Sequence, residues 1–212
     1  MMTRTFLAAL LLASTAATPA LAKERRAKPP QEPRAKNVIL FIGDGMGIAT
    51  ITAARIYDGQ KRGETGEENQ LSFEKFPNVA LVKTYNTNAQ VPDSAGTASA
   101  MNTGVKTRIG VLGIGPEATR GVCREALAHQ LPTLGEKAKA HGLAVGIVTT
   151  TRITHATPAA VYAHTADRDW ESDTGIPASQ QGQGCKDIAQ QLVDAKGAGR
   201  GREIMLSLLN KS

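Results

Sequence analysis

After its first twenty-odd residues, the sequence contains no apolar run that approaches the roughly 20 residues a membrane helix needs. It also contains no internal repeat and no low-complexity segment, apart from a basic stretch near the N-terminus. Hydrophobic residues make up 41% of the chain and charged residues 21%, which is typical of a globular protein. The sequence therefore predicts a globular chain without a membrane span beyond its first residues.

A net charge is almost absent from the main part of the chain. The formal net charge is +6, but residues 23–36 carry +4 of it and Arg4 carries another, so residues 37–212 carry only about +1. The basic stretch contains three prolines and almost no large apolar side chain, and it is predicted to be a disordered linker. Nucleic-acid binding needs a basic patch on the folded surface, and residues 37–212 carry too little net positive charge to form one. Nucleic-acid binding is therefore disfavoured.

The N-terminus has the layout of a secretory signal peptide. Arg4 precedes an apolar run over 6–12, and residues 20–22 read ALA, a small-x-small cleavage site. We expect residues 1–22 to be removed, the mature chain to begin at Lys23, and the protein to be exported to a periplasm or to the cell exterior. The alternative is that the run forms a short buried helix.

Cysteine is scarce: Cys123 and Cys185 are the only two. In an exported chain with no third cysteine, the oxidising compartment favours a disulfide between them. Such a bond would close a long loop and stabilise the fold by about 4 kcal/mol in the chain-entropy account. The alternative, two separately buried thiols, stays open at this point.

The order of the predicted elements indicates an α/β fold. Apolar runs of strand length alternate with helical patterns, as expected where a parallel sheet is covered by helices. We expect a layered sandwich with a mostly parallel central sheet and helices on both faces, incomplete at its C-terminus. The predicted strands are 37–42, 79–84 and 143–149, and the predicted helices are 48–57, one that begins at Pro92, 134–141, 158–166 and 186–195.

Three groups of polar residues follow predicted strands. Asp44 follows the first, Ser94 the second, and the segment 149–157 the third. Ligands of open α/β sheets collect at the carboxyl ends of the strands. Taken singly, an Asp between glycines is usually a turn former and a Ser at a helix start is usually a cap. Their coincidence at one edge favours a site but does not name a reaction.

A resemblance to a known family indicates which reaction such a site would carry out. Residues 91–98 read VPDSAGTA and resemble the nucleophile motif of alkaline phosphatases, and residues 43–47, GDGMG, resemble the first metal-binding loop of that family. Residues 149–158, TTTRITHATP, and 162–170, YAHTADRDW, are similar to a third family block in its animal-type form. The resemblance runs from residue 37 to about 204. It also implies the Cys123–Cys185 disulfide, because both cysteines fall where animal-type members form one.

The resemblance implies a role for each matching residue. Ser94 would attack phosphorus and become phosphoserine, and Arg168 would hold two phosphoryl oxygens and be steadied by Asp93. Asp44 would bridge a zinc and a magnesium ion. Thr157 would ligate the magnesium, with His155 near it but not as a ligand. The family binds two Zn²⁺ and one Mg²⁺, hydrolyses phosphate monoesters and commonly forms homodimers.

The sequence departs from the family after Ile204. The family supplies most zinc ligands from its C-terminal half, which the 212 residues do not include. We therefore expect residues 37–204 to be the N-terminal part of an alkaline phosphatase domain and 205–212 to be a tail foreign to the family, left by a truncation or frameshift. Two hypotheses stay open: an alkaline phosphatase, or a non-catalytic remnant that binds phosphate or a divalent ion weakly. Sulfatases and phosphodiesterases rank lower, because their nucleophile motifs differ.

Overall fold

The computed structural model describes residues 35–197 and 204–208. The chain divides into two units, 1–41 and 42–212. The expected signal peptide and residues 23–34 of the expected linker lie outside the described residues. In the first unit only 35–41 are described, and they carry no helix or strand. No helix among the described residues has the length and apolarity to cross a bilayer.

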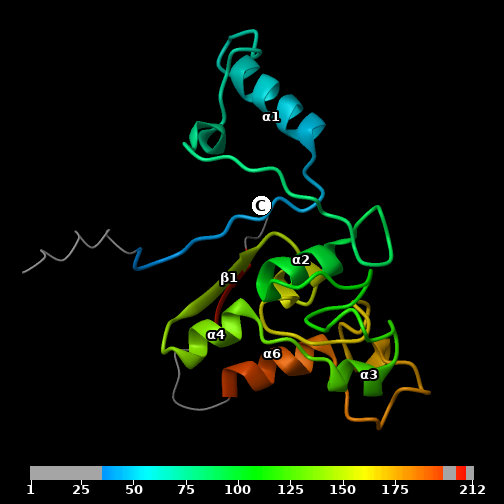
Figure 1. Cartoon of the computed structure of the whole chain (residues 1–212). Helices are drawn as coiled ribbons and strands as arrows, with labels where there is room; N and C mark the ends of the chain where they lie inside the picture. The colour runs from blue at the N-terminus through cyan, green and yellow to red at the C-terminus, as the bar shows by residue number, and fades with distance from the viewer. Residues whose placement is uncertain (1–34, 198–203, 209–212) are drawn as a thin grey trace, which may run out of the picture. The chain divides into compact units, whose positions relative to one another are not determined.

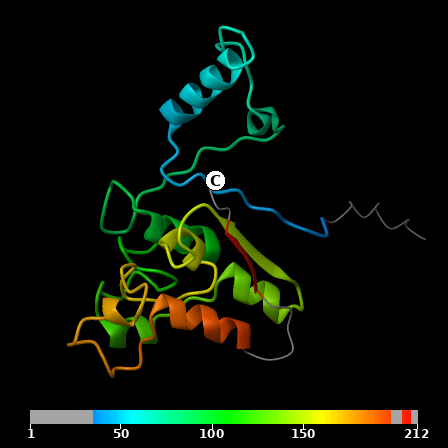
Figure 2. The ribbon, with the colours of Figure 1, turned by 180° about the vertical axis from the view of Figure 1, so that it is seen from behind.

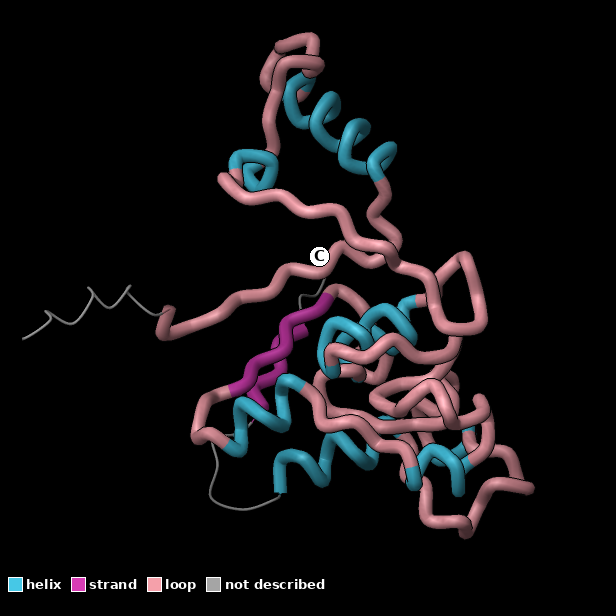
Figure 3. The backbone as a smooth tube through the Cα atoms, viewed as in Figure 1, coloured by secondary structure: helices cyan, strands magenta, loops and turns pink. Residues whose placement is uncertain are grey.

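The second unit contains all the described helices and a small parallel sheet (Figure 1). The α-helices are α1 (Ile48–Gln60), α2 (Ser94–Thr103), α3 (Cys123–Ala128), α4 (Leu134–Ala140), α5 (Ala156–Ala159) and α6 (Ile188–Gly197), and the 3₁₀ turns are η1 (Ser72–Lys75) and η2 (Asp173–Gly175). Strand β1 (Val145–Thr149) pairs in parallel with β2 (Ile204–Leu208). In Figure 3 these two strands lie side by side among helices and long loops. The sequence reading did not predict β2.

Helices α4 and α5 pack against β1, and α2 packs against both of these helices. Figures 1 and 2 show α4 next to β1 from opposite sides. The main core joins small residues of α2 and α5 to larger apolar residues, among them Ile147 of β1, Ile188 of α6 and Leu112 of the segment between α2 and α3. Because α2 and α5 contribute alanines to this core, their backbones can approach closely. A second core surrounds Trp170 and Cys123.

Local sequence explains where two of these helices begin and end. Thr133 and Glu136 form a capping box at the start of α4, in which the Thr133 hydroxyl accepts from the Glu136 N–H at 3.1 Å and the Glu136 carboxylate accepts from the Thr133 N–H at 2.8 Å. Gly142, at φ +72°, ends the turn that follows α4. Asp93 caps α2, and Gly104, at φ +83°, closes it.

Two predicted strands are absent. Residues 37–42 and 79–84 are not in strands, and most of their large side chains are exposed, for example Phe41 at 85% and Leu81 at 99%. A run that is apolar on both faces forms a strand only between neighbouring strands that satisfy its backbone. The only described sheet consists of β1 and β2, so these two runs have no pairing partner in it. The strand predictions for 37–42 and 79–84 are therefore wrong for this structure.

The helix predicted over 158–166 is also wrong in extent. Helix α5 starts two residues earlier, which places Pro158 in its first turn, where the missing N–H costs nothing. It ends at Ala159 and is followed by hydrogen-bonded turns up to residue 163. Thr165, inside the predicted helix, instead pairs its backbone with Leu112 in both directions at 2.9 and 3.1 Å. The other predicted helices are present with shifted ends.

The predicted disulfide is present. Cys123 at the start of α3 is bonded to Cys185, 62 positions later in the sequence, with 5.8 Å between their Cα atoms. The Cys123 side chain is fully buried in the second core, next to Trp170 and Ile176. The bond therefore ties the loop before α6 to the core that carries Trp170.

Reducing this disulfide is expected to destabilise the chain by about 4 kcal/mol, because the unfolded chain would regain the entropy of a long open loop. The measurement is denaturant unfolding of the oxidised protein and of a Cys123→Ala/Cys185→Ala variant. Titration of the oxidised chain under denaturant should find no free thiol. Two free thiols, or equal stability of the two forms, would contradict the disulfide.

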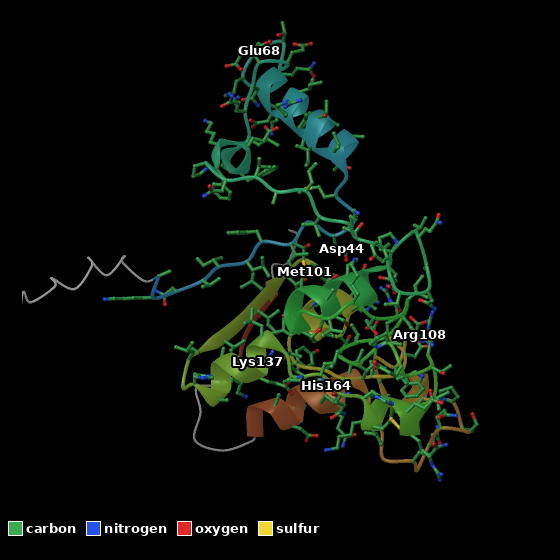
Figure 4. All side chains as sticks on the ribbon, in the orientation of Figure 1. Asp44, Glu68, Met101, Arg108, Lys137 and His164 are labelled. Carbon is green, nitrogen blue, oxygen red and sulfur yellow. A yellow bond between two sulfur atoms is a disulfide. The ribbon has the colours of Figure 1, made fainter. Side chains whose placement is uncertain are left out.

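His164 links α4, α6 and the loop around Gly113 (Figure 4). Its Nδ1 lies 2.8 Å from the Gly113 carbonyl and its Nε2 lies 2.9 Å from the Glu136 carboxylate. Both partners are acceptors, so both bonds form only when the ring is protonated. Burial alone would lower the pKa of His164, but the bonds to Glu136 and Gly113 outweigh it and raise the pKa above its ordinary value. Burial would raise the pKa of Glu136, but the bond from His164 lowers it.

This pair is expected to make stability depend on pH. The raised pKa of His164 contributes stability that is complete below its ordinary value of about 6.5 and is lost as pH rises through the folded value. The lowered pKa of Glu136 gives a contribution that is lost only in acid. Thermal unfolding of the wild type and Glu136→Gln, which retains a capping-box side chain, should differ by less than about 1 kcal/mol, most near pH 6 and less near pH 9. A difference that does not change with pH would contradict this account.

Candidate active site

Three segments that are far apart in sequence meet around Asp44, Ser94 and Thr157. The Ser94 hydroxyl donates to Asp44 Oδ1 at 3.0 Å, and the Thr157 hydroxyl donates to Asp44 Oδ2 at 2.6 Å. Arg168 joins these segments through Asp93, the residue before Ser94, and through His155, two residues before Thr157. The structure thus brings together the side chains that sequence placed in three separate motifs.

Asp44 lies in a tight turn after the apolar run 37–42. The Met46 N–H bonds to the Gly43 carbonyl at 3.3 Å, and Gly45 has φ +67°, a conformation that glycine adopts without a Cβ clash. The hydrogen bond from Thr157 lowers the pKa of Asp44, and the bond from Ser94 adds to this effect. The carboxylate is therefore ionised at neutral pH, and it is exposed to solvent, so a cation could reach it.

Ser94 is the first residue of α2, directly after the cap residue Asp93. Asp93 Oδ1 accepts from the Gly96 N–H at 3.0 Å, which fixes the first turn and the position of Ser94. The N–H groups of a helix start favour a negatively charged ligand. Asp44, whose pKa is lowered, is a poor base for the Ser94 hydroxyl, so the pair as it stands holds the serine in place more than it activates it.

Asp93 organises the arginine as well as the helix. Arg168 Nη1 donates to Asp93 Oδ2 at 3.1 Å, and the same oxygen accepts from the Gly110 N–H at 3.0 Å. Partial burial would raise the pKa of Asp93, but the Gly96 N–H and the Arg168 guanidinium outweigh it, and the pKa is lowered. Asp93 thus stays charged and holds Arg168 on the side of the Ser94 turn.

His155 contacts Arg168 from the other side. Arg168 Nη2 lies 3.1 Å from His155 Nε2, and since a guanidinium can only donate, the ring accepts through this nitrogen. The proton of a neutral ring is then on Nδ1, which is buried and has no partner among the described residues. His155 precedes α5, so the same short segment supplies Thr157 to Asp44 and the ring to Arg168. The guanidinium carries more N–H donors than these contacts use.

Sequence reasoning missed two residues that shape this arrangement. Asn86 donates to Asp93 Oδ1 at 3.0 Å, and a Cβ on Gly96 would come within 2.4 Å of the Asn86 amide oxygen, so Gly96 makes room for Asn86. Gly110, at φ +81°, bonds to Asp93 and accepts from the Arg168 N–H at 2.8 Å. Neither lies in a motif that the family resemblance used, and only the three-dimensional contacts identify them.

The oxygen atoms of Asp44 and Thr157 fit magnesium better than zinc as metal ligands. Mg²⁺ takes oxygen ligands and commonly keeps several waters beside one or two protein groups, which matches one carboxylate with a threonine hydroxyl. A catalytic zinc needs about three protein ligands, chiefly histidine and carboxylate. The described residues contain no group of three His, Cys, Asp or Glu side chains arranged to hold a metal. The zinc ions implied by the resemblance are therefore not accommodated by these residues alone.

Comparison with known proteins identifies the family of this chain. The family model described as alkaline phosphatase matches residues 35–207, most of the chain. The chain belongs to the alkaline phosphatase family. The match begins before the apolar run that leads to Asp44 and ends within β2, so it includes every residue of the candidate site.

Several alkaline phosphatases are similar in sequence. The tissue-nonspecific isozyme of Gallus gallus is 58% identical over 160 residues, which is 76% of this chain and 31% of that protein. The Homo sapiens tissue-nonspecific isozyme is 56% identical over 159 residues (75% and 30%), and the Gadus morhua alkaline phosphatase is 55% identical over 161 residues (76% and 34%). The chain thus spans about a third of the length of these curated relatives.

Two solved structures share the fold. A cold-active alkaline phosphatase from the psychrophile Shewanella sp. has a TM-score of 0.52 and 24% identity, covering 79% of this chain and 44% of that one. A TAB5 alkaline phosphatase mutant with Mg bound in its M3 site has a TM-score of 0.50 and 22% identity, covering 78% and 50%. These likenesses support an α/β fold of the alkaline phosphatase kind.

Proposed function

We propose that this chain carries the nucleophile and the phosphate-binding arginine of an exported alkaline phosphatase that hydrolyses phosphate monoesters through phosphoserine. The observation that supports this most strongly is the convergence of Ser94, Asp44 and Arg168, which are tied together through Asp93, Thr157 and His155. The motif Ser94 with Asp93 before it and Gly96 after it gives the serine a fixed place at the start of α2.

In this proposal Arg168 binds the phosphoryl group. Its planar fork can pair with two phosphoryl oxygens, which a lysine ammonium cannot do with the same geometry. Asp93 and His155 fix the guanidinium plane from two sides, so little rotamer entropy is lost when the substrate binds. Ser94, at the helix start, then faces phosphorus with its hydroxyl oxygen, and catalysis depends on this positioning and on neutralising charge.

Asp44 and Thr157 are proposed to hold a magnesium ion. A bound cation would neutralise phosphoryl charge and lower the pKa of oxygen groups that contact it. The zinc pair of the family is proposed for the longer protein only, whose remaining ligands lie outside these residues. The complete layered sandwich with helices on both faces, export to a periplasm or the cell exterior, and a homodimer are likewise proposals that follow from family membership.

The phosphate- and metal-binding residues present here also support a second proposal, for the 212-residue chain by itself. With the nucleophile and arginine but without a zinc ligand set, it would bind phosphate or a divalent cation weakly and turn over at trace rates. This second function, a non-catalytic phosphate binder, is favoured by the poor basicity that the lowered pKa of Asp44 implies.

Arg168→Lys tests the phosphate-binding role. In a protein that continues residues 1–204 with the C-terminal part of an alkaline phosphatase relative, called here the extended protein, we expect kcat/KM for a chromogenic phosphate monoester to fall roughly 100-fold, equivalent to about 3 kcal/mol. The control Arg62→Lys, on a surface pair with Asp58, should leave kcat/KM unchanged. An unchanged kcat/KM in Arg168→Lys would overturn the proposed role.

A further inference from the structure

Arg168 is flanked in sequence by two acidic residues, Asp167 and Asp169, and both bond to one other arginine. Arg120 donates from Nε to Asp167 Oδ2 at 2.8 Å and from Nη2 to Asp167 Oδ1 at 2.9 Å, a forked pair. The same Nη2 lies 3.2 Å from Asp169 Oδ2. One guanidinium therefore holds the residues on both sides of the proposed phosphate-binding arginine.

The backbone around these residues is tied to the same place. The Arg168 N–H donates to the Gly110 carbonyl at 2.8 Å, and the Gly121 N–H donates to the Ala166 carbonyl at 2.9 Å. A Cβ on Gly110 would lie 2.4 Å from Arg120 Nε, so the guanidinium stem packs directly on this glycine. Gly110 also bonds to Asp93, the partner of Arg168. Arg120 thus packs on the turn that anchors Arg168 through both its backbone and its side chain.

The charge of Arg120 also affects how an anion would bind near Arg168. Two carboxylates next to an anion-binding arginine would repel a phosphate and would compete for the Arg168 guanidinium. Asp167 is mostly covered, with 20% of its side chain exposed, and Asp169 is 76% exposed, so solvent screens the first less than the second. The Arg120 charge offsets both at short range.

We propose that Arg120 is a positioning residue for phosphate binding: it clamps the segment that carries Arg168 and neutralises the carboxylates of Asp167 and Asp169. This inference rests on the proposed function of Arg168. No sequence pattern pointed to Arg120, which lies outside the three motifs that the resemblance used. Its role is visible only because residues 47 and 49 positions apart meet at one guanidinium.

The test uses the 212-residue chain and two readouts. The first is amide hydrogen exchange without any ligand, at the N–H groups of Arg168 and Asp169. In Arg120→Gln these amides should exchange several-fold faster than in the wild type. In Arg62→Gln, which removes a surface ion pair elsewhere, they should not change. Unchanged exchange in Arg120→Gln would overturn the clamp regardless of what phosphate does.

The second readout is inorganic phosphate binding at low ionic strength, followed by NMR. Two uncompensated carboxylates near the anion should weaken binding roughly fivefold in Arg120→Gln. Adding Asp167→Asn and Asp169→Asn, which keep the side-chain acceptors, should restore most of the affinity. Loss without restoration would mean that Arg120 acts through folding alone and would refute the charge role.

The variant Arg168→Gln separates the proposed function of Arg168 from the proposed role of Arg120. If wild type and Arg168→Gln bind phosphate equally or not at all, the proposed function of Arg168 fails, and the charge role of Arg120 fails with it, while the exchange result still decides the clamp. If Arg168→Gln loses binding and Arg120→Gln does not, the proposed function stands and the charge role of Arg120 is wrong.

Discussion

In the extended protein, Ser94→Ala should lower kcat for phosphate monoesters by about 10³-fold or more, because removal of a covalent nucleophile eliminates the two-step route. The side chain is small and sits at a helix start, and Asp93 rather than Ser94 accepts the capping hydrogen bond from Gly96. We therefore expect the variant to fold with near-normal stability. The loss should appear in kcat, with phosphate affinity changed much less.

The control for this substitution is Ser172→Ala, an exposed serine whose hydroxyl contacts Thr174. It should leave kcat and the unfolding midpoint unchanged. If Ser94→Ala retains more than about a tenth of the wild-type kcat while it remains folded, Ser94 is not the nucleophile.

The 212-residue chain without any extension is expected to hydrolyse phosphate monoesters at no more than trace rates. Catalysis of phosphoryl transfer is mainly electrostatic, and one arginine with a single carboxylate and a threonine cannot replace the cations that the family uses. Activity of the extended protein should exceed that of the short chain by several orders of magnitude at equal molar concentration and saturating metal.

The matching measurement is turnover of a chromogenic phosphate monoester at alkaline pH by both proteins, with metal content determined on each sample. The extended protein with Ser94→Ala serves as the baseline for contaminating phosphatase. Robust, chelator-sensitive turnover by the short chain above that baseline would show that metal ligands have been overlooked in these 212 residues.

Local turns and helix starts were easier to predict from the sequence than the sheet. The segments 43–47, 91–98 and 149–170 could be picked out because turn glycines, helix starts and the family motifs are local in sequence, although the residue that caps α2 is Asp93 and not Ser94. Strands depend on distant partners. The runs 37–42 and 79–84 have strand composition, yet they are unpaired in the described structure because a strand needs a neighbour for its backbone.

The contacts that hold Asp93 and Arg168 in place could not be predicted from the sequence, because they too depend on partners outside the local segment. Asn86 and Gly110 bond to Asp93 from 7 and 17 positions away, Arg120 bonds to Asp167 from 47 positions away, and no local pattern marks these three residues. Thr165, predicted to be helical, instead pairs with Leu112, more than 50 positions away, and helix propensity could not foresee this pairing. The disulfide could be predicted, because two cysteines allow only one intramolecular pairing.

Peptide mass spectrometry of the acid-quenched extended protein, after reaction with a phosphate monoester, tests whether Ser94 is the nucleophile. We expect a phosphoryl group on the peptide that contains Ser94, absent from the Ser94→Ala variant and diminished in Arg168→Lys. Turnover with no phosphoryl group at Ser94, or with the group on another residue that survives Ser94→Ala, would contradict the account.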